Sequence, residues 1–373
     1  MLQAVTAEQA QTKVESSSRL PVKLFGTIHA GLFTNTGEAN WLDLPNLVAA
    51  RAAGEPTGST SMSLRQTRLG LSLDGLVAAG ARWNGLVAFD FFGGIPAFQT
   101  GPVMGLPRLL YAFARGDWGQ TSVEVGQDEM VLAPRNPTSL AALAFPALFR
   151  SGNLYLRVPQ VRVEQRIATG DVGQLAVTGA VVAPISGDFT SALYAFVPPA
   201  LTGERSRWPA AQGRLAWRRR PAGTGLAWDL GLSGHYGRER NGAGSREVSA
   251  VAVDADLAIG RVGLAGEWFS GENLDAFGGA LGQARRSHGG FAEVRLTAWP
   301  GLDLVAGGGT DRLPHAERSG AALSRNLTWF GNAIYRFTPE LSTSVEYRWL
   351  ETRTTAGATR RNQHVDWVVA VSF

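Results

Sequence analysis

Apolar and polar residues alternate with a period of two, in blocks of about ten residues, along almost the whole chain. The last block, NQHVDWVVAVSF at 362–373, carries its apolar side chains on one parity: Val365, Trp367, Val369, Val371 and Phe373. The opposite parity carries Asp366 and Ser372, so charge is confined to one face. Alternation of this kind predicts β-strands that have one apolar and one polar face.

The same pattern predicts sixteen strands separated by turn-forming residues. We expect them at residues 22–33, 62–73, 80–92, 107–117, 119–127, 153–167, 172–183, 210–220, 224–237, 247–259, 261–270, 287–298, 302–310, 325–337, 341–352 and 362–373. Long connections follow the odd-numbered strands, at 34–61, 93–106, 128–152, 184–209, 238–246, 271–286, 311–324 and 353–361. Tight turns follow the even-numbered strands, for example at 74–75, 168–171, 221–223, 300–301 and 338–340.

An even number of strands with alternating long and short connections is typical of a transmembrane antiparallel β-barrel, with short periplasmic turns and long extracellular loops. Closure is required in a bilayer, because an open sheet edge would leave backbone groups unpaired in hydrocarbon. A soluble all-β sandwich is the alternative, but it rarely gives sixteen strands with two classes of connection. The pattern therefore favours the membrane barrel.

Tryptophan placement supports the barrel, because indole rings collect at the two membrane interfaces. One group is expected near the short turns: Trp83, Trp118, Trp217, Trp228 and Trp299. A second group is expected toward the long loops: Trp268, Trp329, Trp349 and Trp367.

Composition narrows the remaining classes of protein. The chain has 373 residues and no cysteine, which excludes disulfides and thiolate chemistry. A net charge of +4 is not the basic patch of a nucleic-acid-binding protein. The mean hydropathy of −0.03 fits a barrel whose apolar outer parity and polar inner parity average to about zero. We expect two parts, a short N-terminal periplasmic segment at 1–21, flexible or helical, and the barrel at 22–373.

The terminal phenylalanine and the alternating residues before it resemble the signal by which outer-membrane barrels are recognised for assembly. Sixteen strands, this terminus and a long third loop resemble the bacterial general and substrate-selective porins over residues 22–373. Within that class, RQTRLGLSLDG at 65–75 and the segment 109–145 look most like the DcaP-like porins, and the N-terminal segment is similar to a remnant of the coiled coil that some of them carry.

The resemblance implies a multi-pass protein of the Gram-negative outer membrane that acts as a passive diffusion channel and needs no cofactor or metal. Its implied partners are the lipid bilayer, small hydrophilic solutes, two further copies in a homotrimer and the barrel assembly machinery. It also implies that the third loop, 128–153, folds into the lumen, where residues 139–144 would form a short helix.

The inner parity of a wide barrel lines water, so its charged residues are the candidate functional set. We expect the pore lining and constriction to include Arg68, Arg82, Arg162, Arg166, Asp90, Glu124, Asp128, Glu129 and Arg135. The four strand arginines are expected to cluster opposite polar groups of the third loop. The alternative for each arginine is a wall salt bridge that only braces the barrel.

Other functions have weaker support in the sequence. Ser233 and His235 are the only candidates for a lipase-like barrel enzyme, and they lack the Gly-x-Ser-x-Gly spacing. Asp254 and Asp256 are more simply explained as partners of arginine than as a calcium site. The run at 307–309 is more plausible as a thin place in the wall than as a phosphate cradle. A structural or adhesive barrel plugged by its own loops remains a further alternative.

Overall fold

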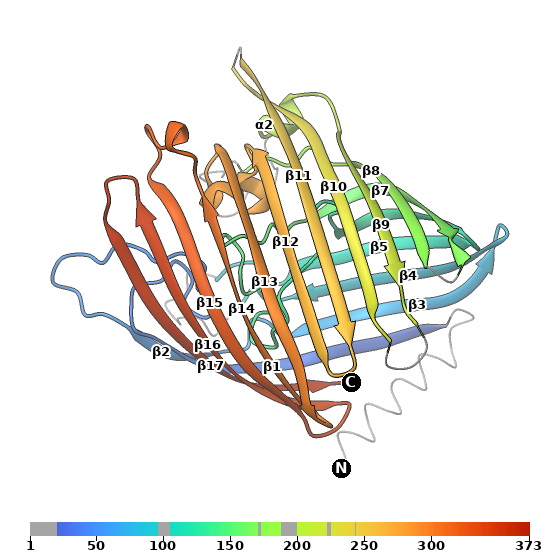
Figure 1. Cartoon of the computed structure of the whole chain (residues 1–373), viewed down its shortest axis with the longest axis horizontal. Coiled ribbons are helices and arrows are strands. Elements are labelled where there is room, and N and C mark those ends of the chain that lie inside the picture. The colour runs from blue at the N-terminus through green and yellow to red at the C-terminus, as the bar shows by residue number, and fades with distance from the viewer. Residues whose placement is uncertain (1–20, 96–104, 171–172, 188–199, 222–224, 243) are drawn as a thin grey trace.

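The strands of the described chain form one antiparallel β-sheet that closes on itself (Figure 1). The computed structural model describes residues 21–95, 105–170, 173–187, 200–221, 225–242 and 244–373. The strands are β1 Val22–Asn35, β2 Ser59–Ser63, β3 Arg68–Ala78, β4 Ala81–Asp90, β5 Arg108–Trp118, β6 Thr121–Glu129, β7 Arg157–Ala168, β8 Gln174–Val182, β9 Ala210–Arg219, β10 Ala227–Asn241, β11 Gly244–Ile259, β12 Val262–Glu272, β13 Arg286–Trp299, β14 Leu302–Arg312, β15 Leu323–Arg336, β16 Leu341–Thr354 and β17 Thr359–Ser372. The short helices are α2 Thr202–Arg205, η3 Asp275–Phe277, η4 Gly279–Gly282 and η5 His315–Glu317. The N-terminal segment at 1–20 lies outside the described residues.

The first and last strands close the barrel. Ile28 of β1 lies opposite Val371 of β17 in an antiparallel ladder. The ladder ends on two backbone hydrogen bonds of 3.0 Å, in which Gly26 and Phe373 each donate to the other's carbonyl oxygen. Both β2 and β3 pair with β1, so these two segments share one position in the wall. The barrel therefore has the sixteen strand positions that the sequence predicts.

The break between β2 and β3 lies within the second predicted strand, 62–73. Thr67 donates its backbone N–H to the carbonyl oxygen of Leu64 at 3.0 Å, which makes a tight turn in the middle of the wall. The turn directs the side chain of Gln66 to the backbone of residues 141–144 in the third loop. The alternating pattern continues on both sides of the break, so parity does not reveal it.

Two predicted connections are wrong. Asp74 and Gly75 do not turn the chain: the ladder between β3 and β4 shifts register there, and Gly75 has a φ of +76°, which is the geometry of a β-bulge. The turn follows at Ala79 and Gly80, whose φ angles are +50° and +72°. The long loop expected at 238–246 is also absent, because β10 and β11 remain paired up to Asn241 and Gly244. Glycine and asparagine mark bulges and hairpin tips as well as loops.

The outer surface of the barrel is apolar. Successive outward side chains such as Val251, Val253 and Leu232 are about half exposed. Trp83 packs edge-on against Trp118 near the turn end, with their ring centroids 5.7 Å apart. The exposed fractions of Trp268 and Trp329, on the loop-end half of the wall, are 47% and 57%. Trp367 departs from the prediction, since its indole donates to Thr343 near the turn end of β16.

The buried apolar core lies inside the barrel at its loop end. Leu132 and Leu154 of the third loop pack with Phe269, Leu274 and Phe277 from β12 and the connection that follows it. Among the described residues, no helix is long and apolar enough to cross a membrane. The loops therefore fill much of the lumen at the loop end, which we call the upper lumen. Toward the turn end, the lower lumen, the polar wall is left facing the interior.

Candidate functional site

The third loop, residues 130–156, leaves β6 and runs along the inner wall. The carboxamide oxygen of Gln212 on β9 accepts the backbone N–H groups of Val131 and Leu132 at 2.7 and 3.1 Å. The hydroxyl of Ser233 on β10 accepts the N–H of Ala133 at 3.1 Å. Buried backbone donors are therefore satisfied by wall side chains.

Wall carboxylates hold the next part of the loop. The backbone N–H of Arg135 donates to Glu267 at 3.1 Å. The backbone N–H and the hydroxyl of Thr138 both donate to the Glu293 carboxylate, at 2.8 and 2.7 Å. The hydroxyl of Ser139 donates to Glu346 on β16. Within a few residues the loop has passed from β12 to β16.

The next part of the third loop contacts strands on the other side of the barrel closure, namely β1, β3 and β5. A ring nitrogen of His29 lies 2.9 Å from the carbonyl oxygen of Leu140. Gln66 donates to the carbonyl of Ala141 at 2.8 Å and accepts the N–H groups of Leu143 and Ala144 at 2.8 and 2.9 Å. The helix expected at 139–144 is therefore wrong, because these backbone groups bond to the wall instead of to the preceding turn.

The loop then returns to β7 across the lumen. The hydroxyls of Ser151 and Thr328 lie 2.8 Å apart. Gly152 has a φ of +97°, and a Cβ at this position would lie 2.1 Å from the carbonyl oxygen of Gly290 on β13. Only glycine fits so close to the wall in this conformation.

A cavity of about 150 Å³ lies between this loop and the wall, and we call it the eyelet. It is lined by Arg68, Tyr111, Glu129, Asn136, Pro137, Ala142, Leu143, Pro146, Tyr155 and Arg157. The guanidinium of Arg157 lies 4.7 Å from the ring centroid of Tyr111 and 4.9 Å from that of Tyr155. Burial raises the pKa of the Tyr155 phenol above its ordinary value, so this side chain stays neutral.

The eyelet has an excess of positive charge. Glu129 accepts a hydrogen bond from the Tyr111 hydroxyl at 2.8 Å and lies 3.8 Å from the Arg157 guanidinium. Arg68 donates to the carbonyl oxygen of Leu143 and forms no ion pair within the described part of the chain. Two guanidinium groups thus face one carboxylate.

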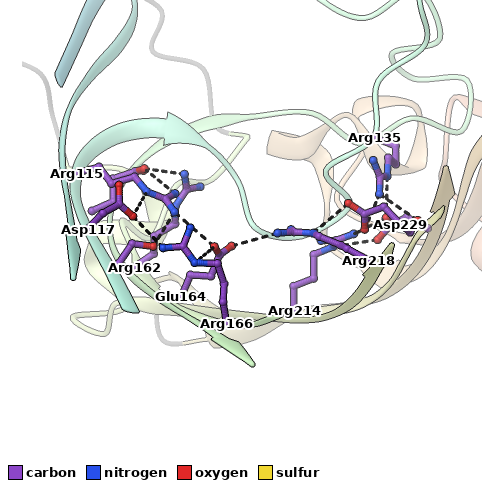
Figure 2. Close-up of polar contacts among 12 residues, drawn as sticks. Arg115, Asp117, Arg135, Arg162, Glu164, Arg166, Arg214, Arg218 and Asp229 are labelled. Carbon is purple, nitrogen blue, oxygen red and sulfur yellow. Dashed lines mark hydrogen bonds and ion pairs between the residues drawn. The ribbon is translucent and has the colours of Figure 1, made fainter. Parts of the chain in front are cut away.

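Below the loop, the wall carries a continuous network of ion pairs from β5 to β11 (Figure 2). Arg166 lies 3.1 Å from Asp117, and Arg218 joins Glu164 at 3.7 Å to Asp229 at 3.1 Å. The network reaches the loop through Arg135, which lies 2.8 Å from Asp254, 2.9 Å from Asp229 and 3.9 Å from Asp256. Asp254 and Asp256 are thus partners of arginine, and the described residues include no group of three side chains suited to a metal ion.

Two larger cavities open toward the turn end. One of about 880 Å³ is lined by residues that include Arg166, Arg218 and Asp229. Another of about 400 Å³ is lined by residues that include Asp256 and Arg295. Both cavities are larger than the eyelet, and both are lined by charged side chains of the wall.

The structure places six of the nine predicted pore residues in three groups. Arg68 and Glu129 line the eyelet. Arg162 lies 2.7 Å from Glu124 and 2.6 Å from Asp128, which makes this trio a compensated wall cluster. The buried Asp90 pairs with Arg108 at 2.6 Å.

The other three predicted residues lie elsewhere. Arg135 joins the loop to the wall, and Arg166 contacts the carbonyl oxygen of Gly119 in a turn at 2.9 Å. Arg82 is exposed on β4, two positions from the turn at Ala79 and Gly80. The four strand arginines therefore do not gather at one place.

Sequence reasoning missed Arg157, Tyr111 and Tyr155. Parity counted from Arg162 along β7 places Arg157 on the outer face. Its guanidinium nevertheless lies over the rings of Tyr111 and Tyr155, so the alternation fails at the first residue of β7. No local sequence pattern marks this failure.

Comparisons with known proteins show the fold. No family model and no curated protein matches the sequence. The outer membrane channel DcaP of Acinetobacter baumannii is 16% identical, with a TM-score of 0.72 over 94% of this chain and 97% of that chain. OprB of Pseudomonas putida is 12% identical, with a TM-score of 0.62 over 98% and 97%. An anion-selective porin from Comamonas acidovorans is 10% identical, with a TM-score of 0.58 over 94% and 99%. The chain therefore shares its closed sixteen-stranded fold with outer-membrane channels and porins.

Proposed function

We propose that this protein is an outer-membrane porin through which small hydrophilic solutes and ions diffuse passively. The observation that carries the proposal is the combination of an apolar outer wall with a charged lumen that a tethered internal loop narrows to the eyelet. The fold shared with DcaP and OprB supports it. In the proposed porin, the short turns face the periplasm and the long loops face the outside of the cell.

The change in cavity volume from about 880 Å³ to about 150 Å³ supports selection by size. The uncompensated Arg68 supports a preference for anions, because charge in a narrow and poorly screened passage acts strongly on a permeating ion. The paired arginines of the wall contribute less, since carboxylates within 4 Å cancel their field.

The porin proposal includes no catalytic step. The exposed fractions of Ser233 and His235, which face the lumen, are 4% and 7%. Ser233 accepts a loop N–H, and His235 packs edge-on against Phe277. A barrel lipase would need these groups on the lipid-facing surface near the rim, so both are better explained as anchors of the internal loops.

Three partners follow from the proposal. The apolar wall would contact the bilayer, and part of it would contact two further copies in a homotrimer. Val365, Trp367, Val371 and Phe373 are outward-facing and at least one-third exposed, which leaves the terminal signal accessible to the assembly machinery.

The test is electrical. Purified protein inserted into a planar bilayer should give stepwise conductance, and its reversal potential in a salt gradient should show a preference for anions. A folded, inserted sample without steps would refute the porin and leave the plugged structural barrel, which the loop packing in the upper lumen also fits.

A further inference from the structure

The outer wall of the barrel carries a groove of about 530 Å³ across β12, β13, β14 and β15. Its two ridges are Trp268 of β12 and Trp329 of β15, both about half exposed. Between them, Gly290 and Gly308 provide no side chain, and the small Ala292 stands beside Gly308 in the ladder. The groove is therefore a thin strip of wall between two indoles.

The glycine run at 307–309 explains why the wall is thin on both sides. Gly308 faces outward, where a Cβ would lie 2.2 Å from the indole of Trp329. Gly309 faces the lumen, where a Cβ would lie 2.2 Å from the carbonyl oxygen of Ser151 in the third loop. The loop thus packs directly behind the groove and supports its floor.

A basic rim lies above the groove, toward the loops. His288 and Arg312 are opposite each other in the ladder, and the Arg312 Nε donates to the His288 Nε2 at 2.7 Å. The residues two and four positions below them along the strands form the groove floor, about 7–13 Å away at roughly 3.3 Å per residue. That separation suits a headgroup above an acyl chain.

Arg312 is exposed and has no carboxylate partner among the residues described. The outward faces of β12 to β17 at the loop end carry more arginine than carboxylate. The arginines are Arg286, Arg312, Arg325, Arg353 and Arg361, and the carboxylates are Glu272 and Glu351. Glu272 pairs with Arg286, and Glu351 bridges Arg325 and Arg361. Arg312 and Arg353 are therefore the two arginines of this set that have no carboxylate partner among the described residues.

We propose that this groove binds one molecule of a phosphorylated, multiply acylated glycolipid of the lipid A type. An acyl chain lies between Trp268 and Trp329, and a phosphate contacts Arg312, with His288 beside it. The apolar floor and the cationic rim complement the two parts of such a lipid. This proposal of a lipid site rests on the proposed function, because an outer-membrane porin has its loop end in the outer leaflet of the membrane.

The test is native mass spectrometry of the full chain in detergent, titrated with bisphosphorylated lipid A. Arg312→Gln is expected to weaken binding about tenfold, as for the loss of one charge-assisted hydrogen bond. Arg238→Gln is the matched control, because Arg238 is also outward-facing at the loop end but stacks on Tyr236 away from the groove. It should change binding less than twofold, roughly the scatter expected of a surface substitution.

A second set of variants tests whether the lipid needs the space in the groove. Ala292→Trp should abolish binding of lipid A, whereas Ala306→Trp, on an exposed outward position beside the groove, should not. Equal binding of phosphatidylglycerol, or of lipid A without phosphates, would overturn the assignment. So would an Ala292→Trp variant that changed oligomeric state, because the groove would then be a subunit interface. Bilayer conductance should be unchanged in all four variants, which separates this proposal from the porin proposal.

Discussion

Ion pairing separates the luminal arginines into those whose charge is compensated and those whose charge is not. Arg162 lies within 3 Å of two carboxylates, whereas Arg68 donates to a backbone carbonyl and pairs with no carboxylate of the described residues. A paired guanidinium presents little net field, but an unpaired one in a narrow site presents a full charge. Arg68 therefore dominates the electrostatics of the eyelet, although the sequence places both arginines on the same inner parity.

Replacing Arg68 by glutamine is expected to shift the reversal potential toward that of a cation-preferring pore. A unit charge about 8 Å away, at an effective dielectric constant of about 20, contributes about 2 kcal/mol. Because about 1.4 kcal/mol corresponds to a factor of ten, the anion-to-cation permeability ratio should fall by at least about tenfold, measured in a tenfold salt gradient.

Arg82→Gln is the matched control for this change, since Arg82 is also luminal and unpaired among the described residues but lies at the wide turn end. It should shift the potential much less. An equal shift from both variants would show that selectivity arises from the charge of the whole lumen.

Parity identifies which strand residues face the lumen, but it does not determine their partners. It correctly predicts inward positions for Asp90 and Glu124, both of which are buried in the wall. It does not predict the eyelet, because parity along β7 places Arg157 on the outer face, whereas its guanidinium lies over the ring of Tyr111 inside the barrel. Contacts between β5 and the loop depend on three-dimensional closure that no local pattern encodes.

The third loop is an extended element whose conformation is set by the wall. It has no helix or strand of its own, and its backbone groups bond instead to wall side chains such as Gln212, Glu293 and Gln66. Helix propensity in the alanine-rich stretch at 140–144 is therefore overridden by tertiary hydrogen bonds. The sequence shows that the loop is long and apolar, but the side chains that hold it come from distant strands.

Gln66→Ala is expected to loosen the loop at the eyelet. The change removes three hydrogen bonds and leaves the N–H groups of Leu143 and Ala144 without their acceptor, at a cost of about 1–3 kcal/mol for each buried group. Single-channel recordings should show a larger or noisier conductance.

The matched substitution Gln174→Ala removes a glutamine that lines the lower cavity. It should leave both the conductance and the noise unchanged. If Gln66→Ala also leaves the single-channel record unchanged, this tether does not hold the eyelet closed.

The whole barrel depends on the joining of its two ends, which lie 345 residues apart at the Thr27 and Ser372 hydroxyls. The last residue completes this junction, because Gly26 and Phe373 exchange two backbone hydrogen bonds and the Phe373 ring lies over Gly26. The Phe373 side chain is also half exposed on the outer wall of the barrel. One residue thus combines a structural contact with the exposure that the proposed assembly signal requires.

These two roles of Phe373 separate in an experiment on Phe373→Ala. The backbone hydrogen bonds to Gly26 do not require the ring, so the purified chain should still refold in detergent and show the heat-modifiable gel migration of a closed barrel. In cells, loss of the terminal aromatic should lower the amount of folded protein in the outer membrane several-fold. Phe337→Ala is the control, because Phe337 is an equally exposed aromatic near the turn end. If Phe373→Ala fails to refold in detergent, the ring stabilises the barrel itself and the assembly role is not needed to explain the loss.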